Sequence, residues 1–310
     1  MLLKNSHTRI QEVKFSEIQH KNISVFIKRE DEIHPFISGN KYRKLKYNLQ
    51  EAIHTNKRKL VTFGGAYSNH IAAAAYAGYE YNFETIGVIR GDELATNLEE
   101  VLQTNPTLKF AHEHGMKFHF VSREAYRNKN SEVFLKQLKS KFGDFYLVPE
   151  GGTNHFAVKG CEEILTSEDA QYHVVCSAVG TGGTISGVIN SLNEHQTAIG
   201  FSALKGDFLV NEIKKYVRNS KNWSLNTNYH FGGYAKISEE LITFINQFKL
   251  ETNIPLDPVY TGKMMFGIVH LIKNDFFKEG TKILAIHTGG LQGIEGMNLY
   301  LKKKKLPLIN

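Results

Sequence analysis

Short apolar runs rich in β-branched and aromatic residues alternate along this chain with longer segments of helical character. The pattern predicts strands at residues 24–28, 59–63, 84–89, 117–121, 145–148, 173–178 and 282–287. It predicts helices at residues 41–54, 69–77, 131–142, 154–165, 185–192 and 237–249. Strands that alternate with helices are typical of parallel sheets covered by helices. We therefore expect an α/β protein with open, parallel-rich sheets.

Length and composition refine this picture without changing it. A chain of 310 residues with 41% hydrophobic and 22% charged residues is long for one domain and natural for two α/β lobes. No run approaches the roughly 20 apolar residues that a membrane span requires. Residues 1–13 do not resemble a signal peptide. We expect a cytoplasmic protein without a membrane partner.

Charge and cysteine content exclude two further classes. The formal net charge is +7, but the lysines are scattered rather than gathered in one stripe, so nucleic acid is not an expected partner. Cys161 and Cys176 form neither a CxxC pair nor a metal-ligand spacing. We therefore expect neither a disulfide framework nor a metal site.

Four of the predicted strands end in glycine-rich turns. These turns contain Gly64-Gly65, Gly151-Gly152, residues 180–183 and Gly289-Gly290. Ligands of open α/β sheets bind beyond the carboxyl ends of the strands, and glycine lets the backbone approach them closely. Taken singly, each turn could be an ordinary connection from a strand to a helix. Together they predict a binding site at the edge of a sheet.

The turn at residues 180–184, Gly-Thr-Gly-Gly-Thr, predicts an anion site. It follows an apolar strand and opens a helix, so free backbone N–H groups and the positive end of the helix dipole meet there. The turn lacks the lysine of a P-loop and the spacing of a dinucleotide site. A phosphate monoester on a small cofactor fits this pattern, and a plain tight turn is the alternative.

Lys41 is the candidate nucleophile. It follows Gly39-Asn40 and falls in the first turn of a predicted helix, where the dipole disfavours a cation and lowers the pKa of the ammonium. A lysine must lose its proton before it attacks an aldehyde. The alternative is a solvated surface lysine. Arg43 and Lys44 are expected to face the phosphate or the solvent.

Two more segments carry polar side chains at turns. Ser68-Asn69-His70 precedes an alanine-rich helix, where Ser68 or Asn69 could be the N-cap. The same free N–H groups could hold a substrate carboxylate, while Asn69 donates to a ring oxygen. The hydroxyl of Tyr260 could act as an acid or a base, or the residue could be a core tyrosine. Asp257-Pro258 is expected to form a turn.

These segments together resemble the fold type II enzymes that use pyridoxal 5'-phosphate (PLP), a tryptophan synthase beta-like fold. The closest resemblance is to the D-cysteine desulfhydrase and 1-aminocyclopropane-1-carboxylate (ACC) deaminase family. It extends from about Ile27 to Leu299. The motifs that match in order are residues 39–45 around Lys41, residues 68–70, 180–184, 257–263 and 287–290.

The resemblance implies a role for each motif. Lys41 would hold PLP as a Schiff base and move protons, and Thr288 would lie near the pyridine nitrogen. The implied cofactor-binding residues are Lys41, Asn69, Gly180, Thr181, Gly182, Gly183, Thr184 and Thr288. The implied substrate-binding residues are Ser68, Asn69, His70, Tyr234 and Tyr260, with Lys41, Tyr260 and Ser68 as the catalytic set.

A few positions distinguish activities within the family. ACC deaminases typically carry Glu, Leu and Gln where this chain has Thr261, Thr288 and His70, so the resemblance favours the desulfhydrase. Tyr67 and Ala72 replace a Gln and an Arg that are common in relatives. Residues 231–234 only loosely match the aromatic substrate loop.

The resemblance implies a large cofactor domain, residues 1–44 and 153–310, and a small inserted domain, residues 45–152. It implies a homodimer that acts on a small amino acid and releases a 2-oxo acid and ammonia. Three hypotheses remain open: β-elimination from D-cysteine, deamination of ACC or another lyase or racemase reaction of a D-amino acid, and PLP binding with little catalysis.

Overall fold

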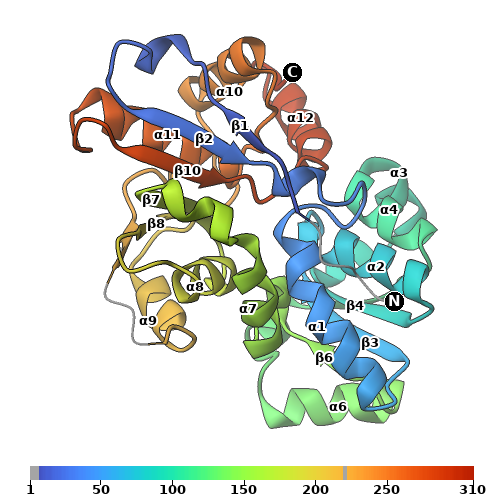
Figure 1. Ribbon diagram of the computed structural model, residues 1–310. Coiled ribbons are helices and arrows are strands. Elements are labelled where there is room, and N and C mark those ends of the chain that lie inside the picture. Colours follow the sequence, from blue (N-terminus) through green and yellow to red (C-terminus); the bar gives the residue numbers. More distant parts are fainter. Residues whose placement is uncertain (1–6, 219–221) are drawn as a thin grey trace.

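The computed structural model describes residues 7–218 and 222–310 and contains two sheets with helices on both faces of each (Figure 1). The strands are β1 (Ile10–Glu12), β2 (Ser24–Lys28), β3 (Lys59–Gly64), β4 (Glu84–Arg90), β5 (Lys117–Val121), β6 (Tyr146–Val148), β7 (Val174–Val179), β8 (Thr197–Ser202), β9 (Trp223–Asn226) and β10 (Lys282–Ile286).

Several α-helices of the described residues begin at a side-chain cap, for example at Ser68, Asn154 and Ser238. The α-helices are α1 (Asn40–His54), α2 (Asn69–Tyr81), α3 (Leu98–Thr104), α4 (Pro106–Glu113), α5 (Arg123–Arg127), α6 (Glu132–Phe142), α7 (His155–Cys161), α8 (Gly183–Asn190), α9 (Phe208–Lys214), α10 (Glu239–Thr252), α11 (Thr261–Lys273) and α12 (Gly293–Lys303).

The larger sheet joins the two ends of the chain. Its strand order is β1-β2-β10-β7-β8-β9, and every pair is parallel except β1 with β2. Alternate residues of β10 enter different cores: Ile283 and Ala285 pack with α10 and α11, whereas Leu284 and Ile286 pack with α8 and α9. This alternation is the period of two that strand geometry imposes. Both faces are therefore buried, as in parallel sheets generally.

The smaller sheet is fully parallel, with the order β5-β4-β3-β6. Leu60 of β3 packs with α1 and α2, while Val61 and Phe63 point to the other face and pack with α5 and α6. The strands of this sheet come from residues 59–148 and thus from one continuous part of the chain. The predicted domain boundary between residues 44 and 45 falls within α1, and the division into domains stays a prediction.

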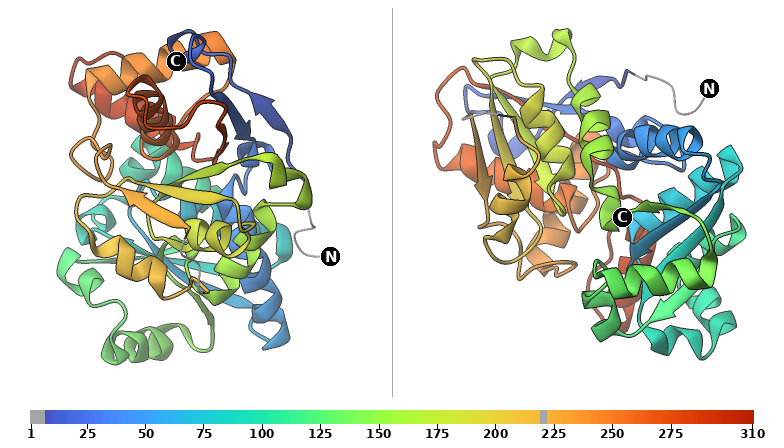
Figure 2. Two further views of the ribbon diagram at one scale, coloured as in Figure 1. Left: turned by 60° about the vertical axis from the view of Figure 1, so that its left-hand side comes forward. Right: turned by 90° about the horizontal axis from the view of Figure 1, so that it is seen from below.

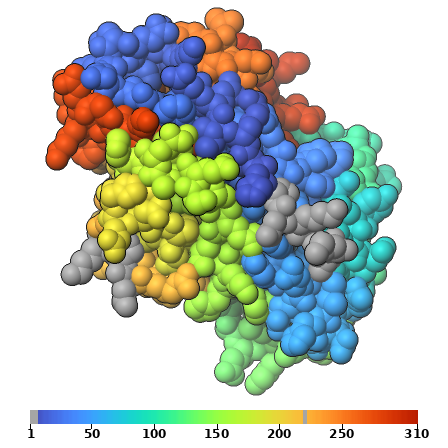
Figure 3. Space-filling model, viewed as in Figure 1, coloured from blue at the N-terminus to red at the C-terminus, as the bar shows by residue number. Residues whose placement is uncertain are grey.

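The two sheets lie side by side, and helices cross between them. α7 packs against both α1 and α8. α12 leaves the larger sheet and reaches α4 beside the smaller one (Figure 1). The right-hand view of Figure 2 shows the two sheets in separate halves of the molecule. In the space-filling view, dark blue and red segments from the two ends of the chain gather in the upper body (Figure 3).

Candidate active site

The loop after β10 fixes the start of the helix that carries Lys41. Asn40 begins α1, and its N–H donates to the carbonyl of Thr288 at 3.2 Å. The preceding residue, Gly39, has φ +61°, and a Cβ there would lie 2.0 Å from the Thr288 oxygen. Only glycine allows this backbone conformation and this close approach together. The carboxyl end of β10 therefore positions Lys41.

Two lysines one helical turn apart point to the same carbonyl group. Lys41 Nζ and Lys44 Nζ each donate to the oxygen of Gly151 at 3.1 Å. Burial, and then repulsion by Lys44, holds the pKa of Lys41 well below its ordinary value. Burial lowers the pKa of Lys44 to about 8. Among the described residues no carboxylate forms an ion pair with either ammonium, so an anionic ligand would relieve their repulsion.

The loop at residues 180–184 supplies backbone donors beside these lysines. Gly182, with φ +85°, is the N-cap of α8, and no side chain caps this helix. The first N–H groups of a helix have no intrahelical partner, and the dipole makes this end positive. Thr181 Oγ1 lies 3.4 Å from Lys44 Nζ, and Asn40 Nδ2 donates to Thr184 Oγ1 at 2.8 Å. The start of α8 and Lys44 thus form one positive cradle.

Residue 183 lies so close to its neighbours in the cradle that a side chain there would displace them. A Cβ at Gly183 would lie 2.8 Å from Thr153 Oγ1 and 3.3 Å from Lys44 Nζ. Thr153 Oγ1 in turn lies 2.5 Å from Thr181 Oγ1 and accepts from Lys44 at 3.0 Å. Hydroxyls, a lysine and helix N–H groups are the donors that bind a phosphate monoester. The residues of this site therefore fit PLP, with Lys41 within reach of the same cradle.

The start of α2 forms the opposite side of the site. Asn69 is its first residue, and Ser68 is the N-cap, whose hydroxyl accepts from the Ile71 N–H at 3.4 Å. A Cβ at Gly290 would lie 2.7 Å from Asn69 Nδ2. The amide of Asn69 is therefore held against the glycine turn after β10. This position suits a donor to a cofactor ring bound beside that turn.

His70 lies behind this surface rather than on it. Its Nε2 is 2.7 Å from Thr62 Oγ1, which donates its single proton to the carbonyl of Val148 at 2.8 Å. From this network we assign the Nε2–H tautomer, and Nδ1 is then a buried acceptor without a partner. Burial, followed by Lys41 and Lys44, lowers the pKa of His70 well below its ordinary value and keeps the ring neutral.

This arrangement corrects one expectation about the carboxylate. A bare ring nitrogen accepts hydrogen bonds and repels an anion, so the His70 ring is not a carboxylate ligand in this tautomer. The first N–H groups of α2, beside Ser68, have no partner within the helix and are available to an anion. The hydroxyl of Thr62 fixes the tautomer of His70, and Thr62 belongs to none of the sequence motifs.

A pair of tyrosines lies beside the loop at residues 180–184. A Cβ at Gly180 would lie 3.0 Å from Cε1 of Tyr260, so the Tyr260 ring rests on the loop. The half-exposed ring of Tyr234 meets it edge on, with centroids 6.3 Å apart. Burial first, and then the neighbouring Tyr234 and Asp257, raises the pKa of Tyr260 well above its ordinary value. Its hydroxyl therefore keeps its proton and can donate a hydrogen bond.

The segment after residue 256 forms the expected turn. Asp257 Oδ1 accepts the N–H groups of Val259 and Tyr260 at 2.9 and 2.8 Å. Asp257 Oδ2 accepts from the hydroxyl of Thr261 at 2.7 Å, and Thr261 Oγ1 accepts from the Asp257 N–H at 2.9 Å. The hydroxyl of Thr261 is fully used in this turn. Thr261 therefore stabilises the start of α11 and does not point its hydroxyl at a substrate.

Arg43 and Lys44, which follow Lys41 in α1, point in different directions. Lys44 faces the positive cradle at the start of α8, where we expect a phosphate. Arg43 was expected there or in solvent, but it is buried and its Nε donates to Glu30 at 2.8 Å. Positions i and i+3 share a helix face, which places Lys44 with Lys41 and turns Arg43 away. Sequence reasoning missed Thr153 and Asn40, although both adjoin the glycine-containing motifs.

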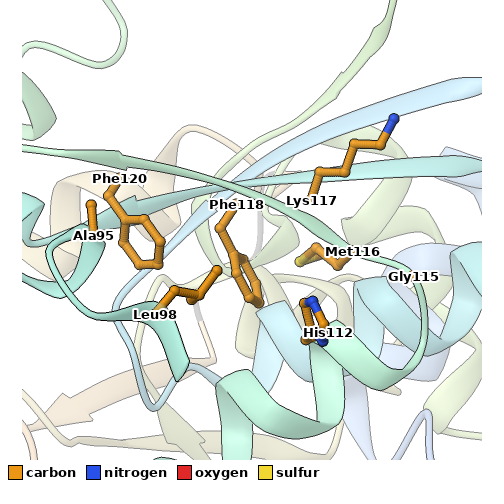
Figure 4. A pocket seen from close by; sticks show the side chains of 8 residues that line it. All are labelled: Ala95, Leu98, His112, Gly115, Met116, Lys117, Phe118 and Phe120. Atoms are coloured by element: carbon orange, nitrogen blue, oxygen red, sulfur yellow. The ribbon is translucent and has the colours of Figure 1, made fainter. Parts of the chain in front are cut away.

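A separate cavity lies at the outer edge of the smaller sheet and takes no part in this site. It has a volume of about 440 Å³ and lies along β5, near α3 and α4 (Figure 4). Its lining residues are Ala95, Leu98, His112, Gly115, Met116, Lys117, Phe118 and Phe120. In the part of the chain that the structure describes, no three His, Cys, Asp or Glu side chains gather as metal ligands. No helix there is long and apolar enough to cross a membrane.

Comparisons with known proteins point to the same chemistry. A profile of the pyridoxal-phosphate dependent enzymes matches residues 3–289. The bifunctional D-cysteine desulfhydrase/1-aminocyclopropane-1-carboxylate deaminase, mitochondrial, of Arabidopsis thaliana is 31% identical over 87% of this chain and 73% of its own. The 1-aminocyclopropane-1-carboxylate deaminase of Rhizobium rhizogenes is 27% identical over 91% of each chain.

A solved structure is similar over almost the whole chain. The crystal structure of an ACC deaminase homologue superposes with a TM-score of 0.81 and 29% sequence identity. The match covers 98% of this chain and 94% of the other. The similarity therefore extends over almost the whole of both chains.

Proposed function

The chain belongs to the pyridoxal-phosphate dependent enzymes, and we propose that it catalyses β-elimination from a small amino acid of the D-cysteine type. The observation that carries this proposal is the pair of α1 lysines that lie beside the start of α8. Lys41 and Lys44 share the carbonyl of Gly151 and lack a carboxylate partner among the described residues. One lysine is available to attack an aldehyde, and the other to bind its phosphate.

We assign the residues of the cradle to the cofactor. Gly180, Thr181, Gly182, Gly183 and Thr184 would hold the phosphate, together with Lys44. Asn69 would donate to the ring oxygen. Thr288, which is buried beside the start of α1, would lie near the ring nitrogen. A hydroxyl at that nitrogen, in place of a carboxylate, tempers the withdrawal of electrons by the ring.

The remaining residues would act on the substrate. When bound, PLP supplies the electron sink that stabilises a carbanion at Cα. The amine of Lys41, with its lowered pKa, removes the Cα proton. The protonated hydroxyl of Tyr260 donates to the departing β-substituent, and Tyr234 closes the site above it. The start of α2 at Ser68 holds the carboxylate.

The overall reaction balances with one water molecule. D-cysteine and water give pyruvate, hydrogen sulfide and ammonia, as the bond from Cβ to sulfur breaks and the C–N bond is hydrolysed. Each step needs only a base, an acid and the cofactor. Lys41 and Tyr260 supply the base and the acid.

Deamination of ACC is the second candidate, because relatives of this chain carry that name. ACC has no Cα proton, so its ring opening needs a different arrangement of nucleophile and acid. The hydroxyl of Thr261, which occupies the position of a glutamate in such deaminases, is used within its own turn. This arrangement favours elimination over ring opening.

The choice of substrate is tested by steady-state kinetics on one preparation. We expect a higher kcat/KM for D-cysteine and 3-chloro-D-alanine than for ACC, because elimination needs only the base at Cα and a leaving group. The L-enantiomers serve as the stereochemical control. A higher kcat/KM for ACC would overturn the desulfhydrase proposal and leave the PLP assignment intact.

The cofactor assignment is tested by trapping PLP on the protein. Borohydride reduction followed by peptide mapping is expected to place PLP on Lys41 in the native enzyme. Lys41→Ala is expected to lose both the visible absorbance of the lysine adduct and turnover, while the cradle still binds PLP weakly. A label on Lys44 or another lysine would contradict the assignment. Lys136→Ala, at an exposed position, is the matched control.

Release of a 2-oxo acid distinguishes an enzyme from a protein that binds PLP with little catalysis.

We further propose that the protein is a homodimer in the cytoplasm. The buried free thiols of Cys161 and Cys176 are consistent with a reducing compartment. Light scattering of the purified protein measures the oligomeric state.

A further inference from the structure

A basic pocket lies near Tyr234, in the loop at residues 231–234. Its volume is about 300 Å³. The residues that line it are Arg90, Arg123, Tyr126, Arg127, Lys129 and Glu150. Four cationic side chains surround a single carboxylate, so the pocket carries an excess of positive charge.

The acidic group in this pocket already has partners. Glu150 accepts from the hydroxyl of the buried Tyr126 at 2.7 Å and pairs with Lys129 at 3.1 Å. Arg123 pairs with Glu93, outside the pocket, at 2.5 Å. Among the described residues, neither Arg90 nor Arg127 has a carboxylate partner. Two guanidinium groups are therefore available to an anion.

Arg90 is held in place by an aromatic ring. Its guanidinium carbon lies 5.8 Å from the centroid of Tyr126, on whose face it rests. The ring is fixed because it is buried and its hydroxyl is bonded to Glu150. Stacking on an aromatic face leaves the N–H groups of an arginine free to bind carboxylate or phosphate. Arg90 is thus preorganised as an anion ligand.

The pocket adjoins the site through two strand ends. Arg90 ends β4, next to β3, in a register that pairs Gly64 with Ile89. A Cβ at Gly65 would lie 3.5 Å from Arg90 Nη2, and the carbonyl of Gly65 accepts the Ser68 N–H at 3.1 Å. Arg90 therefore lies beside the turn from Gly65 to Ser68 that leads into the proposed carboxylate site.

The other strand end brings the pocket to the lysines. Glu150 directly precedes Gly151, whose carbonyl accepts from Lys41. The charges of Arg90 and Glu150 also reach Tyr234: its pKa is raised mainly by burial and is shifted in opposite directions by these two groups. The pocket thus adjoins Tyr234, which meets Tyr260, the proposed donor to the substrate's β-substituent.

We propose that this pocket binds an anionic group at the far end of the substrate's β-substituent, with Arg90 as its principal ligand. The inference rests on the proposed function and specifies its substrate class: amino acids whose β-substituent ends in a phosphate or a carboxylate. For O-phosphoserine, the bond from Cβ to oxygen breaks, and the substrate with one water gives pyruvate, ammonia and phosphate. The start of α2 binds the α-carboxylate and Arg90 binds the second anion.

The test compares an anionic and a neutral substrate in Arg90→Met and Arg90→Lys. Arg90→Met is expected to lower kcat/KM for O-phospho-D-serine by about 10- to 100-fold, as the loss of a charge-assisted hydrogen bond predicts. The value for 3-chloro-D-alanine is expected to change by less than about threefold, because this substrate carries no distal anion. Arg90→Lys keeps the charge and is expected to recover part of the loss. Arg123→Met is the matched control, since Arg123 is already paired with Glu93.

A binding measurement without turnover completes the test. The unreactive analogue 2-amino-3-phosphonopropionate is expected to inhibit the native enzyme at least tenfold more strongly than Arg90→Met. Equal losses for both substrates, or no loss for either, would overturn the role of Arg90 while leaving the elimination activity in place. Absence of PLP on Lys41 and of any 2-oxo acid would instead overturn the proposed function itself. Unfolding midpoints of the variants establish that each is folded.

Discussion

Lys44 is a residue whose burial has a measurable consequence for stability. Its pKa is lowered by burial to about 8 in the folded protein, from an ordinary value of 10.5. Between these two pH values the unfolded chain holds a proton that the folded protein has lost. Unfolding then takes up a proton, so the free energy of unfolding rises with pH in this range.

We therefore expect Lys44→Met to remove a specific pH dependence. In the cofactor-free protein, the free energy of unfolding of the native chain should rise between pH 8 and pH 10 relative to Lys44→Met, by on the order of 2 kcal/mol. Guanidinium denaturation at the two pH values measures this difference. Lys136→Met, at an exposed lysine, is expected to follow the native chain. A Lys44→Met curve parallel to the native one would contradict the lowered pKa.

The surroundings of a single residue could be predicted from sequence where one local motif determines them. The position of Lys41 at a helix start and its lowered pKa were both expected. In the structure, the pKa is lowered by burial first and then by the neighbouring Lys44. The network behind His70 could not be predicted, because it joins Thr62 and Val148 from two strands whose pairing the motifs do not encode.

At the scale of elements, the start of α2 has two uses that can be separated. Ser68 caps the helix through its hydroxyl, and the same residue is a proposed substrate ligand. Ser68→Ala is expected to lower stability by about 1 kcal/mol through the lost cap. Ser68→Asn keeps a capping acceptor and should restore most of that stability. Thermal or chemical unfolding measures both.

Turnover distinguishes the second use. If the hydroxyl contacts the substrate, both Ser68 variants should lose kcat/KM while PLP still binds to Lys41. Native kcat/KM in Ser68→Asn would show that the hydroxyl serves the helix alone. The visible absorbance of the bound cofactor controls for damage to the cradle.

The elements that sequence reasoning found are those with strong apolar runs or clear caps. β2, β3, β4, β5 and β10 were placed within about one residue. The missed strands include β1, β8 and β9; β1 and β9 are short edge strands with partly exposed residues, whose period of two is weak. α11 was missed because its first residues were assigned to a motif. Local pattern carries little information about such segments, since their partners lie far away in the chain.

At the scale of the whole molecule, the site exists only where both sheets meet. Lys41 lies in the first turn of a helix that packs on the smaller sheet, yet its position depends on Thr288, which follows β10 of the larger sheet. The order of the glycine turns was enough to predict that they would gather. The division of the strands between two sheets follows from pairing across the whole chain, which no window of sequence contains.

The interleaved strand order also constrains how the chain acquires its structure. All strands of the smaller sheet lie between residues 59 and 148, whereas Ser24 of β2 pairs with Lys282 of β10. Closing long loops makes contacts between distant residues slow to form. In pulsed hydrogen exchange during refolding, amides of β3 and β4 should gain protection before those of β2 and β10. Simultaneous protection would contradict this order. The cradle at the start of α8 would then form late in folding. Ser68 and Asn69, beside the smaller sheet, would be in place before the cradle is complete.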